Sequence, residues 1–176
     1  MSLYQNKYRI ESIRLKEWDY KNPWWYYVTI NTKNHVSYFG EVTNGEMVLN
    51  KLGNQTETIW KQIPIHYKIV ELDYSIIMPN HIHGIIIINQ NVETRHASSL
   101  QHKYPTLSNI VGSFKSAVTK CAHEKGIINF FWQSRFYERI IRNEKELYNI
   151  RKYIEETIGL EEMYRLEMET VESAGS

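Results

Sequence analysis

Four consecutive isoleucines, Ile85 to Ile88, constrain the fold of this chain more than any other stretch. An uninterrupted run of β-branched residues is typical of a strand that is buried on both faces. His81 and His83 stand directly before the run, after a Pro79-Asn80 pair that indicates a turn. If the strand begins at His81, its period of two sends both imidazoles to one face and Ile82 into the core. The sequence therefore predicts a buried strand that carries a histidine pair.

Two neutral imidazoles side by side suit a divalent metal ion, because each ring offers one nitrogen lone pair. The plain alternative is a pair of solvent-facing strand histidines without a ligand. The spacing of His81 and His83 alone does not decide between these two interpretations, so the rest of the chain has to be considered.

Length and composition limit the classes of protein. The 176 residues suffice for one domain with its own core, which we place at residues 1–160. No apolar stretch approaches the roughly 20 residues of a membrane span, so no membrane partner is expected. The single cysteine, Cys121, excludes an internal disulfide framework and a cysteine-based zinc site, and is typical of a cytoplasmic protein.

Charge is distributed unevenly along the chain. Residues 100–153 contain ten Lys and Arg against four Asp and Glu, whereas residues 154–176 contain one against seven. A basic segment downstream of a candidate metal site favours a polyanionic substrate, although a solvated helix face would have the same composition. The acidic end, residues 161–176, is expected to be a partly disordered tail.

Residue patterns predict the elements of the fold. Strands are expected at 24–32, 38–42, 46–49, 67–78, from His81 through the isoleucines, and at 130–141. Asn44-Gly45 indicates a hairpin turn between the second and third of them. Helices are expected at 51–63, ending at Pro64, at 105–125, between Thr106 and Gly126, and from Asn143 onward. Residues 89–104 are expected to be a loop. This order predicts an α+β sandwich, an antiparallel sheet with helices packed on one face.

The last helix presents one side chain of chemical interest. Leu147, Ile150 and Ile154 form its apolar stripe, and Tyr153 lies on the flank of that stripe, roughly 100° from its centre. A helix packed by the stripe against the sheet can aim the Tyr153 hydroxyl at the histidines. Most such tyrosines only edge a helix, so spacing alone does not assign a role.

Several motifs resemble one known group in combination. They are Met78-Pro79-Asn80 before the histidine pair, SFKSAV at 113–118, WQSRFYERIIRN at 132–143, and Leu147 with Tyr153-Ile154. Shorter similarities lie at 14–16, 19–20, 39–41 and 45–47. Together they cover roughly residues 8 to 158, and they resemble the REP-associated tyrosine transposases, a single-tyrosine branch of the HUH superfamily.

The resemblance implies a ferredoxin-like fold and a metal-dependent enzyme that cuts single-stranded DNA beside hairpins through a 5′-phosphotyrosine. It implies that His81 and His83 bind the metal, Mg²⁺ or Mn²⁺, and that Tyr153 is the nucleophile. The basic segment then supplies DNA contacts, which we expect on one positive surface. These are Lys115, Lys120, Arg135, Arg139 and Arg142. Such a protein would have single-stranded or hairpin DNA as its partner, and a homodimer is one option for its assembly.

One position departs from the family. The group commonly has Asn-Pro at the fourth and fifth positions after the tyrosine, with the amide as third metal ligand, and here Thr157 and Ile158 stand there. A threonine hydroxyl is a weaker neutral ligand than an amide carbonyl, so water can complete the metal shell. The change leaves two functions open: an active nuclease, or a domesticated hairpin-binding protein with impaired catalysis.

Two other metal or phosphate chemistries fit less well. A histidine-triad nucleotide hydrolase would need a third histidine two residues past His83, where Ile85 stands. A cupin-like site would need further His or Glu ligands on later strands, and the expected strand at 130–141 offers only Glu138.

Overall fold

The computed structural model describes residues 3–4, 7–8, 24–89 and 105–157 of the chain. Its strands are β1 (Leu3–Tyr4), β2 (Lys7–Tyr8), β3 (Trp25–Asn31), β4 (Gly40–Thr43), β5 (Glu46–Leu49), β6 (Val70–Ile77), β7 (His81–Ile88) and β8 (Tyr137–Ile141). Its helices are α1 (Lys51–Lys61), α2 (Ile63–His66), α3 (Leu107–Glu124) and a helix over residues 144–157. The expected loop at 89–104, apart from Asn89, and the acidic tail at 161–176 lie outside the described residues.

A four-stranded antiparallel sheet in the order β6-β7-β3-β8 forms the centre of the fold. The elements β3, α1, β6, β7, α3 and β8 follow one another as β-α-β-β-α-β, which is the ferredoxin-like arrangement. The predicted α+β class is therefore confirmed. Strand β7 is buried along its whole length, as the isoleucine run predicts.

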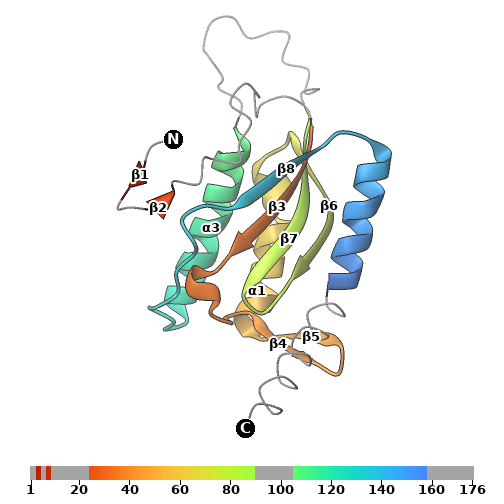
Figure 1. The fold of residues 1–176 in the computed structure, drawn as a ribbon. Helices are drawn as coiled ribbons and strands as arrows, with labels where there is room; N and C mark the ends of the chain where they lie inside the picture. The colour runs from red at the N-terminus through yellow and green to blue at the C-terminus, as the bar shows by residue number, and fades with distance from the viewer. Residues whose placement is uncertain (1–2, 5–6, 9–23, 90–104, 158–176) are drawn as a thin grey trace, which may run out of the picture.

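Helices cover both faces of the sheet (Figure 1), so the expectation of helices packed on one face only was wrong. Helices α1 and α3 pack on the face that carries Tyr26, Val28, Ile82 and Ile86, where the larger core lies. Helix 144–157 packs on the opposite face, where Ile154 joins a smaller core; its other buried members are Tyr27, Ile85, Ile87 and Ile141. The strands' period of two assigns these residues to opposite faces. The sheet is thus the middle of three layers. His81 and His83 lie on the same face as the smaller core.

Local signals account for most of the boundaries. Asn44 and Gly45 both have positive φ, 52° and 76°, in the two-residue turn between β4 and β5, as a type I′ hairpin requires. Thr106 caps α3 in a capping box with Asn109. Pro64 ends α1 as expected, but it also lies in the first turn of the short helix α2, where a proline needs no N–H partner.

The strand expected at 130–141 is shorter in the structure, and this expectation was wrong. Only Tyr137–Ile141 form β8, and Trp132 makes an isolated bridge to Thr32. The Trp132 indole N–H donates to the Lys115 carbonyl at 3.0 Å, and the Lys115 ammonium donates to the Gln133 carbonyl. These bonds hold the segment against α3. As a result, residues 134–136 do not pair with β3.

Gly84 in the middle of β7 lies against the largest buried ring of the core. A β-carbon at this position would come within 2.3 Å of Cζ2 of Trp60, which is 1% exposed and packs edge-on against Phe114. Gly84→Ala is therefore expected to destabilise the protein by about 1–3 kcal/mol, the usual cost of overpacking a core. Urea unfolding measures this as a lower midpoint at unchanged slope.

Gly112 supplies the matched control for Gly84→Ala. It lies on an exposed position of α3, and a β-carbon added there would meet no atom within 4 Å. Gly112→Ala is expected to raise stability by about 0.5–1 kcal/mol, because alanine favours a helix interior. An unchanged midpoint for Gly84→Ala would show that Trp60 can move aside at little cost.

Candidate active site

The histidine pair begins β7 on the face opposite α1 and α3. His81 lies across from Asn31 of β3, and His83 lies across from Thr29. Both side chains are buried, with exposed fractions of 8% and 5%. Tyr27 and Thr29 of β3 share this face by the period of two, and together they surround His83.

The two rings face each other through their Nε2 atoms, which are 3.0 Å apart. Nδ1 of His81 lies 2.6 Å from the Asn80 side-chain oxygen, so this nitrogen donates its proton. Nδ1 of His83 lies 2.7 Å from the Tyr27 hydroxyl and 2.9 Å from that of Thr29. A hydroxyl can accept a proton from Nδ1. Both rings can therefore hold their proton on Nδ1 and leave both Nε2 lone pairs directed to one point.

Burial keeps the two imidazoles neutral. It lowers the pKa of His81 to about 4, with a further contribution from the neighbouring His35, and lowers the pKa of His83 to about 3, with a contribution from His81. Both rings are uncharged at pH 7, which is the form that binds a metal ion.

The donor set fits a divalent metal ion. Two nitrogens that are neighbours at right angles on an ion, each about 2.1 Å from it, are about 3.0 Å apart, which is the separation of the two Nε2 atoms. Each ring also has an Nδ1 partner that orients it, as metal-binding histidines usually do. Within the described ranges no three His, Cys, Asp or Glu side chains cluster. Further ligands would come from hydroxyls, water or a substrate.

Helix 144–157 brings Tyr153 to the histidine pair. The ring of Tyr153 packs edge-on against His83, with ring centroids 5.5 Å apart, and against Tyr27, 6.4 Å away. Tyr153 is 44% exposed, whereas the pair beneath it is buried. Tyr148, on the same helix, is 67% exposed. The structure thus brings His81, His83 and Tyr153 together, with a phenol that a large substrate can reach.

Polar contacts at the start and in the middle of the helix that carries Tyr153 fix its position. At its start the Glu146 carboxylate accepts from the Arg139 guanidinium at 2.7 Å and from the Arg142 backbone N–H at 2.9 Å, and the Glu146 N–H donates to the Asn143 side chain. These contacts lower the pKa of Glu146, the Arg142 backbone bond most of all. Near its middle Arg151 donates to Asp73 of β6 at 2.7 Å. The position of Tyr153 is therefore set by two separate strands of the sheet.

Sequence reasoning missed Tyr27 and Thr29. The Tyr27 hydroxyl contacts His83 and Thr29, and burial raises the pKa of Tyr27 to about 12, so the phenol stays protonated. These residues stand two apart on a strand, which predicts a shared face. The pairing of that face with the histidines depends on the register between β3 and β7, which no local pattern specifies.

Thr157 is buried beneath the last turn of the helix, with an exposed fraction of 2%. Its hydroxyl donates to the Tyr153 carbonyl four residues earlier at 2.6 Å. The proton is thus used within the helix, while the oxygen keeps lone pairs for a further contact.

The five basic residues expected on one surface are distributed around the β8 edge of the sheet. Arg139 lies on the histidine face and is ion-paired with Glu146.

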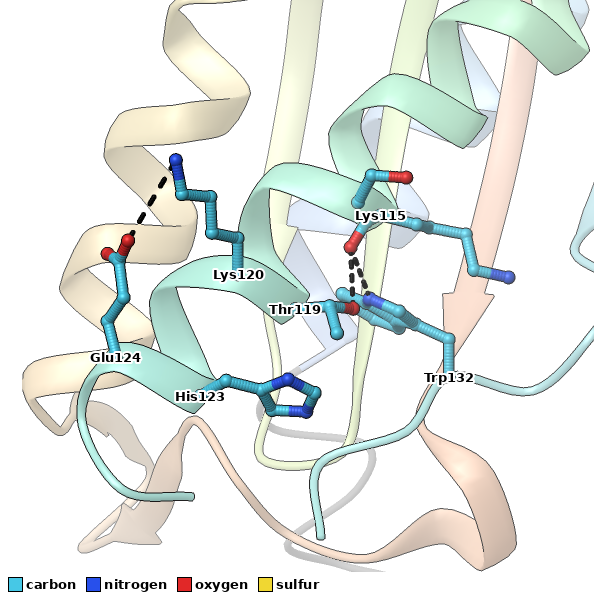
Figure 2. Close-up of a pocket in the computed structure, with 7 residues that line it drawn as sticks. Lys115, Thr119, Lys120, His123, Glu124 and Trp132 are labelled. Carbon is cyan, nitrogen blue, oxygen red and sulfur yellow. Dashed lines mark hydrogen bonds and ion pairs between the residues drawn. The ribbon is translucent and has the colours of Figure 1, made fainter. Parts of the chain in front are cut away.

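Lys115 and Lys120 are on α3, on the other side of the sheet, and line a cavity of about 610 Å³ with Trp132 and His123. Figure 2 shows the two lysines leaving α3 in different directions, Lys120 toward Glu124. Lys115 nevertheless contacts Gln133 on the segment that leads to β8, next to exposed Arg135. The residues do not all share one face.

Known proteins resemble the chain in sequence and in structure. An uncharacterized protein of Haemophilus influenzae is 39% identical over 153 residues, which cover 82% of this chain and 85% of that protein. A REP-associated tyrosine transposase bound to a REP hairpin superposes with a TM-score of 0.53 at 18% identity, covering 89% of this chain and 72% of that one. No protein-family model matches. The described residues include no helix long and apolar enough to span a membrane.

Proposed function

We propose that this chain, which belongs to the same family as the Haemophilus influenzae protein and has the fold of a REP-associated tyrosine transposase, is a metal-dependent DNA nuclease and strand transferase of the HUH type. Its substrate is single-stranded DNA next to a hairpin. One observation carries the proposal: a reachable phenol, Tyr153, packs on a buried pair of neutral imidazoles whose lone pairs converge.

Tyr153 is the proposed nucleophile. Its oxygen forms a bond to the phosphorus, and the bond from phosphorus to the 3′ oxygen breaks. The phenol proton passes to solvent, which reaches the half-exposed side chain, and the 3′ oxygen leaves as a hydroxyl. The 5′-phosphotyrosine keeps the bond energy, so a second 3′-hydroxyl can rejoin the strand without ATP.

His81 and His83 are the proposed metal ligands. Mg²⁺ or Mn²⁺ bound there would polarise the scissile phosphate and neutralise the charge that develops on its oxygens. Asn80, Tyr27 and Thr29 hold the two rings in the orientation this requires. Thr157 is the proposed third protein ligand and the weakest, because a neutral hydroxyl is a weaker ligand than an amide carbonyl. Its hydroxyl donates to the Tyr153 carbonyl, so the oxygen lone pairs remain for the metal ion.

A hairpin-binding protein with impaired catalysis is the second candidate. The observation that favours it is Thr157, which stands where the family implies an amide ligand. This candidate keeps the DNA contacts and loses the covalent step. A denaturing gel after incubation with labelled single-stranded hairpin DNA and Mn²⁺ separates the two, since only an active enzyme leaves DNA attached to the protein.

The DNA contacts are proposed to follow the β8 edge of the sheet, where the basic residues lie on both sides. Arg135 and Arg142 are exposed at the two ends of this edge. Replacing both with alanine is expected to lower the slope of log affinity against log salt by about 1.4, since each phosphate contact to a single strand contributes about 0.7. Fluorescence anisotropy at several salt concentrations measures the slope.

The control for this pair is the double variant Lys51→Ala with Lys61→Ala. Both lysines are exposed on α1, whose main contacts are with α3 and β6. Their removal takes away the same charge and is expected to leave the slope unchanged. An equal fall in the salt slope for both double variants would show that Arg135 and Arg142 make no specific contact with DNA phosphates.

A further inference from the structure

Two exposed aromatic rings flank the site without a place in the proposed chemistry. Phe131 is 53% exposed on the segment that leads to β8, and Tyr137, the first residue of β8, is 39% exposed. Exposed rings can contact a ligand, and their position relative to the histidine pair indicates which kind.

Both rings emerge on the histidine face. Phe130 and Trp132, on either side of Phe131, pack into the larger core on the α1 and α3 side, so the side chain between them is directed away from that core. Gln133, two residues on, contacts the Asn31 side chain, and Asn31 is paired with His81. Tyr137 is paired with Thr29 and packs edge-on against Tyr27, with ring centroids 6.1 Å apart. Phe131 and Tyr137 therefore line one path beside the pair.

Backbone hydrogen bonds hold this path rigid. The Lys33 N–H donates to the Phe131 carbonyl at 2.8 Å, and the Gln133 N–H donates to the Asn31 carbonyl at 2.9 Å. The bridge between Thr32 and Trp132 lies between these two bonds. The segment is thus fixed to the end of β3, and a ligand would find Phe131 already in place, which reduces the entropy lost on binding.

The charge around the rings favours a nucleic acid over a protein. The Lys33 ammonium lies 5.5 Å from the centroid of the Phe131 ring, and exposed Gln133 and Arg135 follow along the path. Rings interleaved with cations are typical of surfaces that bind single strands, because bases stack on the rings while phosphates contact the cations. A docked protein would more often meet a larger apolar patch without these charges.

We propose that Phe131 and Tyr137 form a stacking strip that holds unpaired bases of single-stranded DNA next to the histidine pair, with Lys33 on the adjoining phosphate. The inference rests on the proposed function, because it places the same substrate on the same face. It assigns to the strip the stacking of unpaired bases and leaves the phosphate backbone to the basic residues around β8.

The experiment measures binding of a fluorescein-labelled 20-nucleotide oligothymidine by anisotropy, with EDTA present so that no cleavage occurs. Phe131→Ala and Phe131→Leu are expected to weaken binding by about 5- to 140-fold, the effect of removing one stacked base, whereas Phe131→Trp should retain it. Tyr137→Ala should weaken binding in the same range, and Tyr137→Phe should not. Ile128→Ala is the control, because Ile128 is 70% exposed near Phe131 and has no ring.

The outcomes separate this inference from the proposed function. Equal affinity of Phe131→Ala and the unchanged protein would overturn the strip, and so would full retention by Phe131→Leu, which would indicate an apolar contact without stacking. Failure of the unchanged protein to bind oligothymidine would overturn it as well. The proposed function has its own readout, the covalent adduct on hairpin DNA with Mn²⁺, and stands if that adduct forms whatever the strip variants do. Thermal unfolding checks that each variant is folded.

Discussion

Tyr153→Phe is expected to abolish the covalent adduct between protein and DNA and to leave DNA affinity within about 2-fold of the unchanged protein. The substitution removes one oxygen and keeps the ring that packs on His83 and Tyr27. No phosphodiester can form without that oxygen, whereas the surfaces proposed to bind DNA are untouched. A denaturing gel with labelled single-stranded hairpin DNA and Mn²⁺ measures the adduct, and anisotropy in EDTA measures the affinity.

Tyr148→Phe is the matched control, because it makes the same chemical change five residues earlier on the same helix. Tyr148 is 67% exposed and lies about 140° around the helix from Tyr153. With Ile154 buried against Tyr27 and Ile85, only Tyr153 can face the histidines. Tyr148→Phe should form the adduct at the normal rate. An adduct that persists in Tyr153→Phe and disappears in Tyr148→Phe would overturn the assignment of the nucleophile.

The fixed position of helix 144–157 explains why this test is informative. Arg151 bonds to Asp73 and lies over the rings of Trp25 and Tyr74, at 5.8 and 5.2 Å from the centroids. Removing the Tyr153 hydroxyl breaks none of these contacts, so the helix is expected to stay in place. Loss of the adduct can then be attributed to the oxygen itself.

Local sequence patterns predicted the elements of this fold better than their ends. The isoleucine run after His83 predicted a buried strand, because β-branched residues without polar alternation leave no solvent face, and this is confirmed. The expected strand at 130–141 was mostly wrong, because Trp132 and Lys115 bond to one another across 17 positions of sequence. Such long-range bonds override strand propensity and leave no local signal.

Sequence patterns likewise predicted one part of the candidate site and not the other. His81 and His83 share a face because they are two apart on one strand, and spacing alone predicted this. Their partners Tyr27 and Thr29 are more than 50 positions away and meet them through the register of β3 with β7. The side of the sheet on which the last helix packs was also beyond local patterns. Leu147, Ile150 and Ile154 predict an apolar stripe, but they do not indicate which sheet face receives it.

His81→Ala and His83→Ala are each expected to remove Mn²⁺ binding and to lower the rate of adduct formation on the order of a thousandfold. The metal is proposed to stabilise charge on the phosphate by several kcal/mol, and 1.36 kcal/mol corresponds to a factor of ten in rate. One imidazole cannot replace the pair, because the proposed site depends on two Nε2 atoms 3.0 Å apart and on few other protein ligands. Electron paramagnetic resonance of Mn²⁺ measures binding without any DNA.

His66→Ala is the control for both variants, since His66 lies exposed at the end of α2 and contributes no ligand to the proposed site. It should bind Mn²⁺ and form the adduct as the unchanged protein does. Affinity for single-stranded DNA in EDTA should be unaffected in all three variants, because binding is proposed to depend on the stacking strip and the basic residues and not on the metal. Retention of Mn²⁺ at the same affinity after loss of both His81 and His83 would overturn the metal site. Loss of Mn²⁺ with a normal adduct would show instead that Tyr153 attacks without it.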